Sequence, residues 1–205
     1  MYKKFVKRII DLVLSLVGCF LLAVPMLTIA IIIVIDDPGP IFFKQKRVGI
    51  HKKYFNILKF RTMKMSTPHD VPTHLLEQPE QYITRAGRIL RKTSLDELPQ
   101  IFQILIGEMS VIGPRPALWN QYDLIRERDC YGANDVRPGL TGWAQINGRD
   151  ELPISIKAQY DGEYVQRMSF LFDCKCFFGT ISKVLKQEGV VEGCAGEQEE
   201  EVSVK

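Results

Sequence analysis

Two adjacent carboxylates are the clearest candidates for chemistry in this chain. Asp96 and Glu97 follow a stretch with three cationic side chains, Arg88, Arg91 and Lys92. One interpretation is structural: the Ser-x-x-Glu spacing of residues 94–97 fits a capping box at a helix start, where the helix dipole favours acidic side chains. A helix N-terminus surrounded by arginine and lysine is also a natural phosphate site, so the two interpretations are compatible.

Two later segments set arginines among glycines and prolines. Gly113-Pro114-Arg115-Pro116 is a stiff turn that presents one guanidinium, whose planar fork suits phosphate. Arg137 and Arg149 flank a stretch whose glycines would let a ligand approach closely, although turn formation alone explains such glycines. Each segment indicates anion binding only in combination with other charged residues.

Other chemistries find little support. The five cysteines contain no CxxC pair, and the three histidines share no metal-ligand spacing, so neither disulfides nor zinc are expected. A reducing, cytosol-facing domain fits this pattern best. The net charge of +3 is mild, but cations gather near the N-terminus and between residues 44 and 64, which favours anionic partners. Nucleic acid is not expected, because no nucleic-acid-reading motif accompanies these cations.

The elements that must position these residues begin with an apolar segment. The chain is almost wholly apolar from Ile9 to Ile35, which is typical of a membrane helix. A straight helix of this length covers roughly 40 Å, whereas a bilayer core is about 30 Å thick. Cations nevertheless flank both ends of the segment, and the positive-inside rule places both ends in the cytoplasm.

Pro25, near the middle of this segment, offers a way to return both ends to one face. Proline removes a backbone donor and kinks a helix. We therefore expect a re-entrant membrane helix, with an ordinary kinked spanning helix as the alternative. The apolar run continues straight into Asp36-Asp37-Pro38, so a cleaved signal peptide is not expected.

The remaining pattern predicts an α+β fold that is mainly helical. We expect a re-entrant helix in residues 1–37, a small compact catalytic domain in residues 38–191 and a disordered tail in residues 192–205. Within the catalytic domain we expect a short β-hairpin with its turn at Gly49, and a mobile loop over residues 66–80. Two amphipathic helices are predicted, one ending about Gly107 and one from Phe170 to Lys186, the latter packing in the core or lying at the membrane interface.

Six motifs in order resemble a known family. They are KRIIDL, GPIFFKQKRVG, KFRTM, TRAGRILRKTSLDELPQ, GEMSVIGPRP and RPGLTGWAQINGRD. Together they resemble the bacterial sugar transferase family of monotopic phosphoglycosyl transferases, in its minimal form, from about Lys3 to Lys186. Members of that family have a re-entrant membrane helix broken at a proline. Val24 stands here where the best-described minimal members have a serine before that proline.

The resemblance implies roles for individual residues. Asp96 would be the nucleophile, and an aspartate with the ordinary pKa of about 3.9 is ionised at neutral pH without a separate base. Glu97 would hold Mg²⁺, which bridges diphosphate oxygens. Arg91 and Arg115 would contact phosphate. Further substrate-binding candidates are Lys59 and Asp161, from matching motifs, and Arg137 and Arg149, from the glycine-rich stretch.

The activity that the resemblance implies is transfer of a sugar 1-phosphate from a UDP-sugar to undecaprenyl phosphate, with release of UMP through an aspartyl intermediate. One alternative is a one-step transfer in a ternary complex, with Asp96 as a base. Another is a catalytically silent scaffold tethered to the membrane. We expect contact with membrane lipid, a catalytic domain on the cytoplasmic face of the bacterial inner membrane, and allow for a homodimer.

Overall fold

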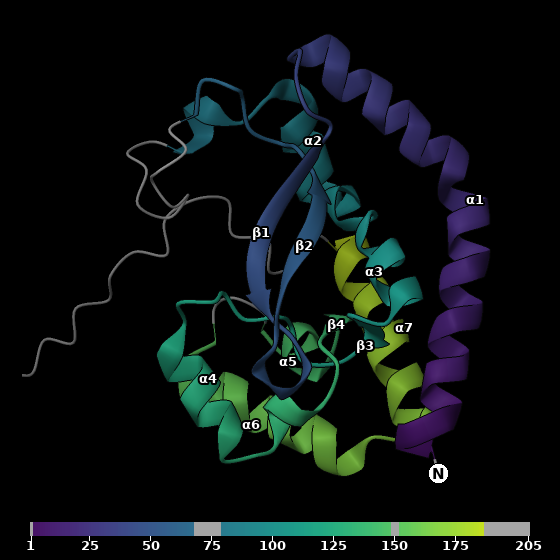
Figure 1. The fold of residues 1–205 in the computed structure, drawn as a ribbon, viewed down its shortest axis with the longest axis vertical. Helices are drawn as coiled ribbons and strands as arrows, with labels where there is room; N and C mark the ends of the chain where they lie inside the picture. The colour runs from purple at the N-terminus through teal and green to yellow at the C-terminus, as the bar shows by residue number, and fades with distance from the viewer. Residues whose placement is uncertain (1, 68–78, 149–151, 187–205) are drawn as a thin grey trace, which may run out of the picture.

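The computed structural model describes residues 2–67, 79–148 and 152–186 (Figure 1). Arg149, most of the predicted 66–80 loop and the 192–205 tail lie outside these ranges. The described part is mainly helical with two small sheets, in agreement with the predicted class. The division of the chain at residues 37 and 191 stays a prediction.

A π-helical turn, Tyr2–Val6, leads into the long helix α1, Lys7–Asp36. Among the described residues, α1 is the one helix long and apolar enough to cross a membrane. Most of its apolar side chains are exposed, unlike those of a core helix in a soluble protein. The helix is continuous through Pro25 and bends along its length, which fits the missing backbone donor (Figure 1).

The predicted hairpin is confirmed. Strand β1, Phe42–Val48, pairs antiparallel with β2, Tyr54–Phe60. A short 3₁₀ turn, Ile50–Lys52, joins them, and the Gly49 amide donates to the Lys53 carbonyl at 2.8 Å. One face of the hairpin packs through Phe55 and Ile57 against Ile104 and Met109.

Helices α2, Arg85–Thr93, and α3, Gln100–Ile106, follow the hairpin. Thr84 caps α2, because its side chain accepts a bond from the Gly87 amide at 2.9 Å. The predicted end of this helix at about Gly107 is confirmed: Gly107 is the C-cap residue of α3 and adopts the positive φ of 93° that glycine accommodates easily. A 3₁₀ turn, η5, Leu95–Glu97, connects the two helices.

Much of the rest of the chain lies around the lower end of the hairpin in Figure 1, and its last helix lies between α3 and α1. Strands β3, Ser110–Ile112, and β4, Gly139–Thr141, pair in parallel, and neither was predicted. The helices of this part are α4, Tyr122–Asp129, α5, Trp143–Ile146, α6, Ile154–Arg167, and α7, Phe170–Lys186. The bounds of α7 are those predicted. Tyr164 of α6 packs with Phe172 and Cys176 of α7 in the largest core cluster.

Candidate active site

Asp96 and Glu97 lie in the 3₁₀ turn between α2 and α3, and both are buried. Ser94, just before this turn, adopts a left-handed conformation with φ of 57°. Its amide closes the end of α2, and its side chain makes no capping bond. The capping-box interpretation therefore fails, because an N-cap residue normally has an extended backbone, whereas Ser94 is left-handed and its side chain makes no cap bond.

Side chains from three separate segments meet at Glu97. The Lys59 ammonium of β2 donates to Glu97 Oε1 at 2.7 Å, and the Arg115 guanidinium donates to the same oxygen at 2.9 Å. The same ammonium lies 3.6 Å from Asp96 Oδ2. The structure thus brings together four of the predicted site residues, Lys59, Asp96, Glu97 and Arg115.

The two carboxylates differ in their proton affinity. Burial raises the pKa of Asp96, and repulsion from Glu97 adds to this, although the charges of Lys59, Arg91 and Arg115 oppose the rise. Burial would also raise the pKa of Glu97, but the bonded Arg115 and Lys59 outweigh it and hold that pKa well below its usual range. The pKa of Asp96 in the folded protein is therefore higher than the ordinary value that was assumed from the sequence.

Arg91, in the last turn of α2, completes the cationic surroundings of the pair. Its Nε donates to Thr62 Oγ1 at 2.9 Å, which fixes the side chain, and its charge acts on Asp96. Thr62 was not predicted as part of the site. Thr62 follows β2 in the KFRTM motif, which also contains Lys59. This motif therefore supplies the Lys59 charge and the hydroxyl that fixes the Arg91 guanidinium.

Gln103 is a second residue that the sequence did not reveal. Its buried side-chain amide accepts from the Leu58 amide and donates to the Asn56 carbonyl, each at 2.8 Å. The amide thereby substitutes for a neighbouring strand along β2, directly before Lys59. Because Gln103 belongs to the helix that begins three residues after Glu97, it joins the two segments that carry Lys59 and Glu97.

Three predicted residues are placed differently. Asp161 of α6 is buried and accepts from Arg128 Nε at 2.8 Å, and burial raises its pKa against the opposing charge of Arg128. Arg137 Nε donates to the Gly107 carbonyl at 2.9 Å, at the end of α3. Neither residue has a contact with Asp96 or Glu97 among the bonds and ion pairs of the described residues. Arg149 lies outside the described residues.

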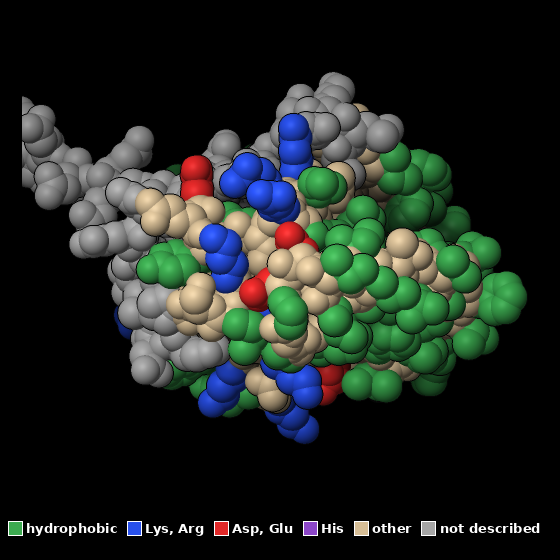
Figure 2. Space-filling model, turned by 90° about the horizontal axis from the view of Figure 1, so that it is seen from above, with side chains coloured by type: hydrophobic (Ala, Val, Ile, Leu, Met, Phe, Trp, Pro, Cys, Tyr) green, Lys and Arg blue, Asp and Glu red, His purple; other side chains and the backbone are tan. Residues whose placement is uncertain are grey.

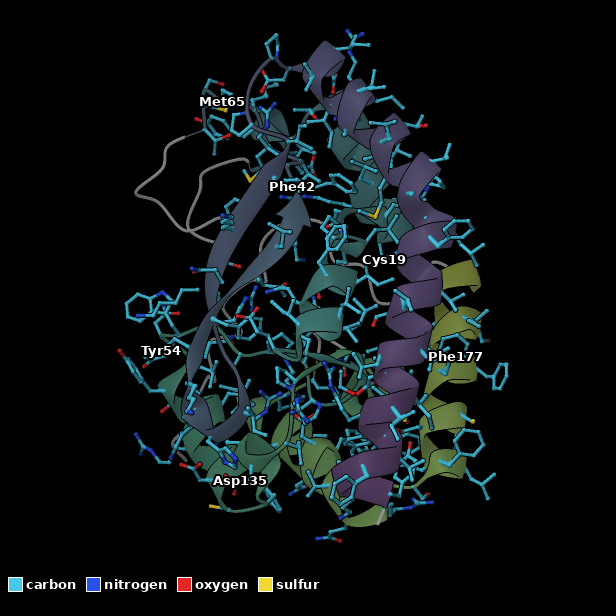
Figure 3. All side chains as sticks on the ribbon, turned by 45° about the vertical axis from the view of Figure 1, so that its right-hand side comes forward. Cys19, Phe42, Tyr54, Met65, Asp135 and Phe177 are labelled. Atoms are coloured by element: carbon cyan, nitrogen blue, oxygen red, sulfur yellow. The ribbon has the colours of Figure 1, made fainter. Side chains whose placement is uncertain are left out.

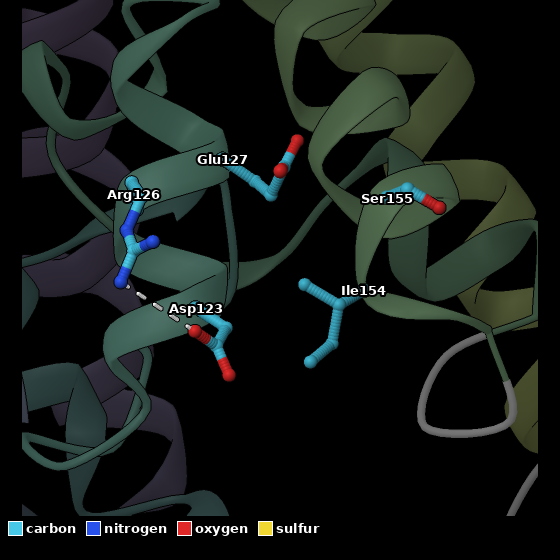
Figure 4. A pocket seen from close by; sticks show the side chains of 5 residues that line it. All are labelled: Asp123, Arg126, Glu127, Ile154 and Ser155. Atoms are coloured by element: carbon cyan, nitrogen blue, oxygen red, sulfur yellow. Dashed lines mark ion pairs between the residues drawn. The ribbon is translucent and has the colours of Figure 1, made fainter.

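A cavity of about 410 Å³ lies elsewhere, between α4 and α6 (Figure 4). Its lining residues are Asp123, Arg126, Glu127, Ile154 and Ser155. It is open and contains none of the predicted site residues. We assign the site to the Asp96–Glu97 cluster instead, because buried, charged groups with shifted pKa values converge there.

Comparison with known proteins decides the family. The model of a family described as bacterial sugar transferase matches residues 2–187. The chain belongs to the bacterial sugar transferase family. The assignment made from the motifs is confirmed, and so is the enzyme class, a phosphoglycosyl transferase.

Several relatives of this bacterial sugar transferase are described by name. The uncharacterized sugar transferase EpsL of Bacillus subtilis is 40% identical, over 90% of this chain and 89% of EpsL. The exopolysaccharide production protein ExoY of Rhizobium meliloti is 33% identical, over 89% of this chain and 87% of ExoY. The UDP-glucose:undecaprenyl-phosphate glucose-1-phosphate transferase of Xanthomonas campestris is 38% identical over 89% of this chain, which spans only 39% of that relative.

The site of this bacterial sugar transferase has donors that suit a hard cation. Mg²⁺ prefers oxygen ligands and usually needs only one or two carboxylates when substrate phosphates and water complete its shell. Asp96 and Glu97 supply two adjacent carboxylates, although no cluster of three metal-binding side chains occurs in the described ranges. The residues therefore fit an ion that binds together with a diphosphate better than an ion bound by protein alone.

Proposed function

We propose that this bacterial sugar transferase moves a sugar 1-phosphate from a UDP-sugar to undecaprenyl phosphate and releases UMP. The observation that carries the proposal is the Asp96 carboxylate, buried beside Lys59 and within the field of Arg91 and Arg115. Such cations stabilise the phosphates of a substrate and the charge that develops during phosphoryl transfer. The names of the Xanthomonas relative and of a similar Escherichia coli relative support this substrate pair.

In the first step, an Asp96 carboxylate oxygen attacks the β-phosphorus of the UDP-sugar. A new bond forms between that oxygen and phosphorus, and the bond from phosphorus to the bridging oxygen breaks. UMP departs with the bonding electrons, and the phosphosugar stays on Asp96. Lys59 and Arg115 draw the anionic diphosphate toward the anionic nucleophile, and their bonds to Glu97 keep both cations in place.

In the second step, a phosphate oxygen of undecaprenyl phosphate attacks the phosphorus of the intermediate. The acyl phosphate bond breaks, Asp96 is restored as a carboxylate, and the product is a polyprenyl diphosphate sugar. Glu97 would hold Mg²⁺, with Asp96 beside it. An ion bound there would neutralise part of the negative charge of the diphosphate.

The attachment of α1 supports a re-entrant helix rather than a spanning one. At its start, Lys7 donates to Asp173 of α7 at 2.8 Å and Arg8 donates to the Ile104 carbonyl at 2.6 Å. At its end, Asp36 accepts from the Ala86 amide of α2 at 2.9 Å. Both ends are therefore bound to the same catalytic domain, as expected when both face the same side of a bilayer.

The surface agrees with this arrangement. Figure 2 shows hydrophobic side chains gathered over the side on which Figure 1 places α1, with lysines and arginines beside them. Phe177 of α7 also points away from the protein on the side of α1 (Figure 3). We propose that this face enters the bacterial inner membrane and that the catalytic domain faces the cytoplasm, where the cations flanking α1 favour it.

One observation favours a second candidate mechanism. The raised pKa of Asp96 suits a base that takes a proton from the lipid phosphate during a one-step transfer. The two mechanisms differ in the absence of acceptor. Detergent-solubilised protein incubated with a panel of UDP-sugars, without lipid, releases UMP up to one equivalent per enzyme in the two-step mechanism and none in the one-step mechanism. No UMP from any UDP-sugar, with or without lipid, contradicts the proposed activity.

A further inference from the structure

Phe43 lies on the hairpin face that carries Lys59. The register of the hairpin pairs Phe43 of β1 directly with Lys59 of β2. Directly opposed residues of an antiparallel pair point to the same face, with Cβ atoms about 4.5–5.5 Å apart. Because Lys59 contacts both Glu97 and Asp96, the Phe43 ring stands beside the cationic site.

The neighbouring Phe42 has a different environment. Phe42 points to the opposite face, where it stacks on Phe60 with ring centroids 5.6 Å apart. Phe43 is 47% exposed and belongs to none of the ring pairs formed within the described ranges. Packing within this part of the protein therefore accounts for Phe42 but leaves the exposed ring of Phe43 unexplained.

We propose that the Phe43 ring is the platform on which the uracil base of the UDP-sugar stacks. The inference rests on the proposed function, because it needs a diphosphate held by Lys59, Arg91 and Arg115. A nucleoside attached to that diphosphate must extend from the site along a neighbouring surface, and the next side chain on the face of Lys59 is an exposed aromatic ring. Flat π systems stack on aromatic side chains, and such a contact tolerates any base because every base has a π face.

The ligand pair UMP and dihydro-UMP isolates the stacking contact. The two share ribose, phosphate and the polar groups of the base, but the saturated base of dihydro-UMP is puckered and not aromatic. Both are measured as inhibitors of the transfer of radiolabelled sugar from UDP-sugar to the lipid acceptor, in wild-type protein and in Phe43→Leu. Phe43→Trp serves as the conservative variant. Tyr54→Leu is the matched control, since Tyr54 is 55% exposed at the other end of the hairpin and points away from α3 (Figure 3).

In wild-type protein, we expect UMP to inhibit at least about fivefold more strongly than dihydro-UMP. Phe43→Leu should bring the two inhibition constants within about twofold, whereas Phe43→Trp and Tyr54→Leu should keep the preference. An equal preference in wild-type protein and Phe43→Leu overturns the inference. Equal inhibition of the wild-type protein by UMP and dihydro-UMP also overturns the inference, and this result does not depend on the folding of any variant. A wild-type protein that UMP does not inhibit contradicts the proposed reaction as well.

Discussion

The Lys59 ammonium lies 2.7 Å from a carboxylate oxygen of Glu97, although the two residues are 38 positions apart in the chain. The same oxygen accepts a bond from Arg115, so one buried anion orders two cations that are proposed to bind the diphosphate. The contact joins the hairpin to the turn that carries Asp96. The arrangement makes Glu97 an organiser of the site in addition to its proposed part in binding Mg²⁺.

Removing the charge of Lys59 should change the titration of Glu97. The folded-state pKa of Glu97 is depressed, so its stabilising contribution is present above the ordinary value of about 4.5 and is lost as the pH falls toward the folded-state value. In Lys59→Met the folded-state pKa values of both Glu97 and Asp96 move up, because the Lys59 charge lowers each of them. The acid limb of the pH profile of transfer should then shift to higher pH, and the free energy of unfolding should fall by about 1–3 kcal/mol.

Lys44→Met is the control, because Lys44 is an exposed lysine on the other hairpin face. This variant should change neither the acid limb nor the stability. A lower rate with an unmoved acid limb would contradict the coupling.

Neutralising Asp96 should stabilise the protein while it abolishes turnover. The folded-state pKa of Asp96 is raised, so the folded protein favours its neutral form, and this contribution is lost as the pH rises through the folded-state value. At pH 7, Asp96→Asn removes a buried charge and its repulsion with Glu97. The melting temperature in detergent should therefore be unchanged or higher by about 2–4 °C, as expected for about 1 kcal/mol. A clear fall in the melting temperature at pH 7 would indicate that the Asp96 charge is a net stabilising group.

Gln103 should matter for both stability and catalysis. Gln103→Leu removes bonds to the backbone of Asn56 and Leu58 and leaves these groups unsatisfied, at a cost of about 1–3 kcal/mol for each buried group. Since β2 then loses its anchor next to Lys59, the transfer rate should fall at temperatures where the variant is fully folded. Gln121→Leu is the control, because the Gln121 amide accepts a backbone bond at an exposed position. Full activity of folded Gln103→Leu would show that the amide does not position Lys59.

The pairing of Asp161 with Arg128 predicts a structural role for both. Arg128→Met leaves a buried carboxylate uncompensated and should cost about 3–5 kcal/mol, whereas Arg128→Met combined with Asp161→Leu should recover much of that loss. Thermal melting of the single and double variants measures this coupling. If Asp161 binds substrate instead, Asp161→Asn will raise the KM for UDP-sugar and leave the melting temperature unchanged.

Local patterns predicted the parts of the fold that local physics determines. The hairpin has two β-prone runs around a turn, α7 has a helical pattern, and both appear where expected. Strands β3 and β4 have three residues each, too few to show an alternation. The Ser-x-x-Glu spacing also failed as a local signal, because Glu97 binds two cations from distant segments, while the Ser94 amide bonds to the Arg91 carbonyl.

The candidate site shows the same division. The motifs supplied Asp96, Glu97, Lys59, Arg91 and Arg115, and the structure brings these residues together. The supports, Thr62 and Gln103, carry no chemical signature in the sequence, since threonine and glutamine are ordinary at such positions. Their importance follows from bonds across 29 and 45–47 positions of the chain.

The proposed two-step reaction requires that Asp96 becomes covalently attached to the phosphosugar. The most direct test is intact-protein mass spectrometry after brief incubation with the accepted UDP-sugar in the absence of undecaprenyl phosphate, followed by peptide mapping. We expect an increase in mass equal to one phosphosugar, located on Asp96, absent from Asp96→Asn and removed when undecaprenyl phosphate is added. An adduct that persists in Asp96→Asn, or complete transfer by a wild-type enzyme that never carries the adduct, would contradict the two-step reaction.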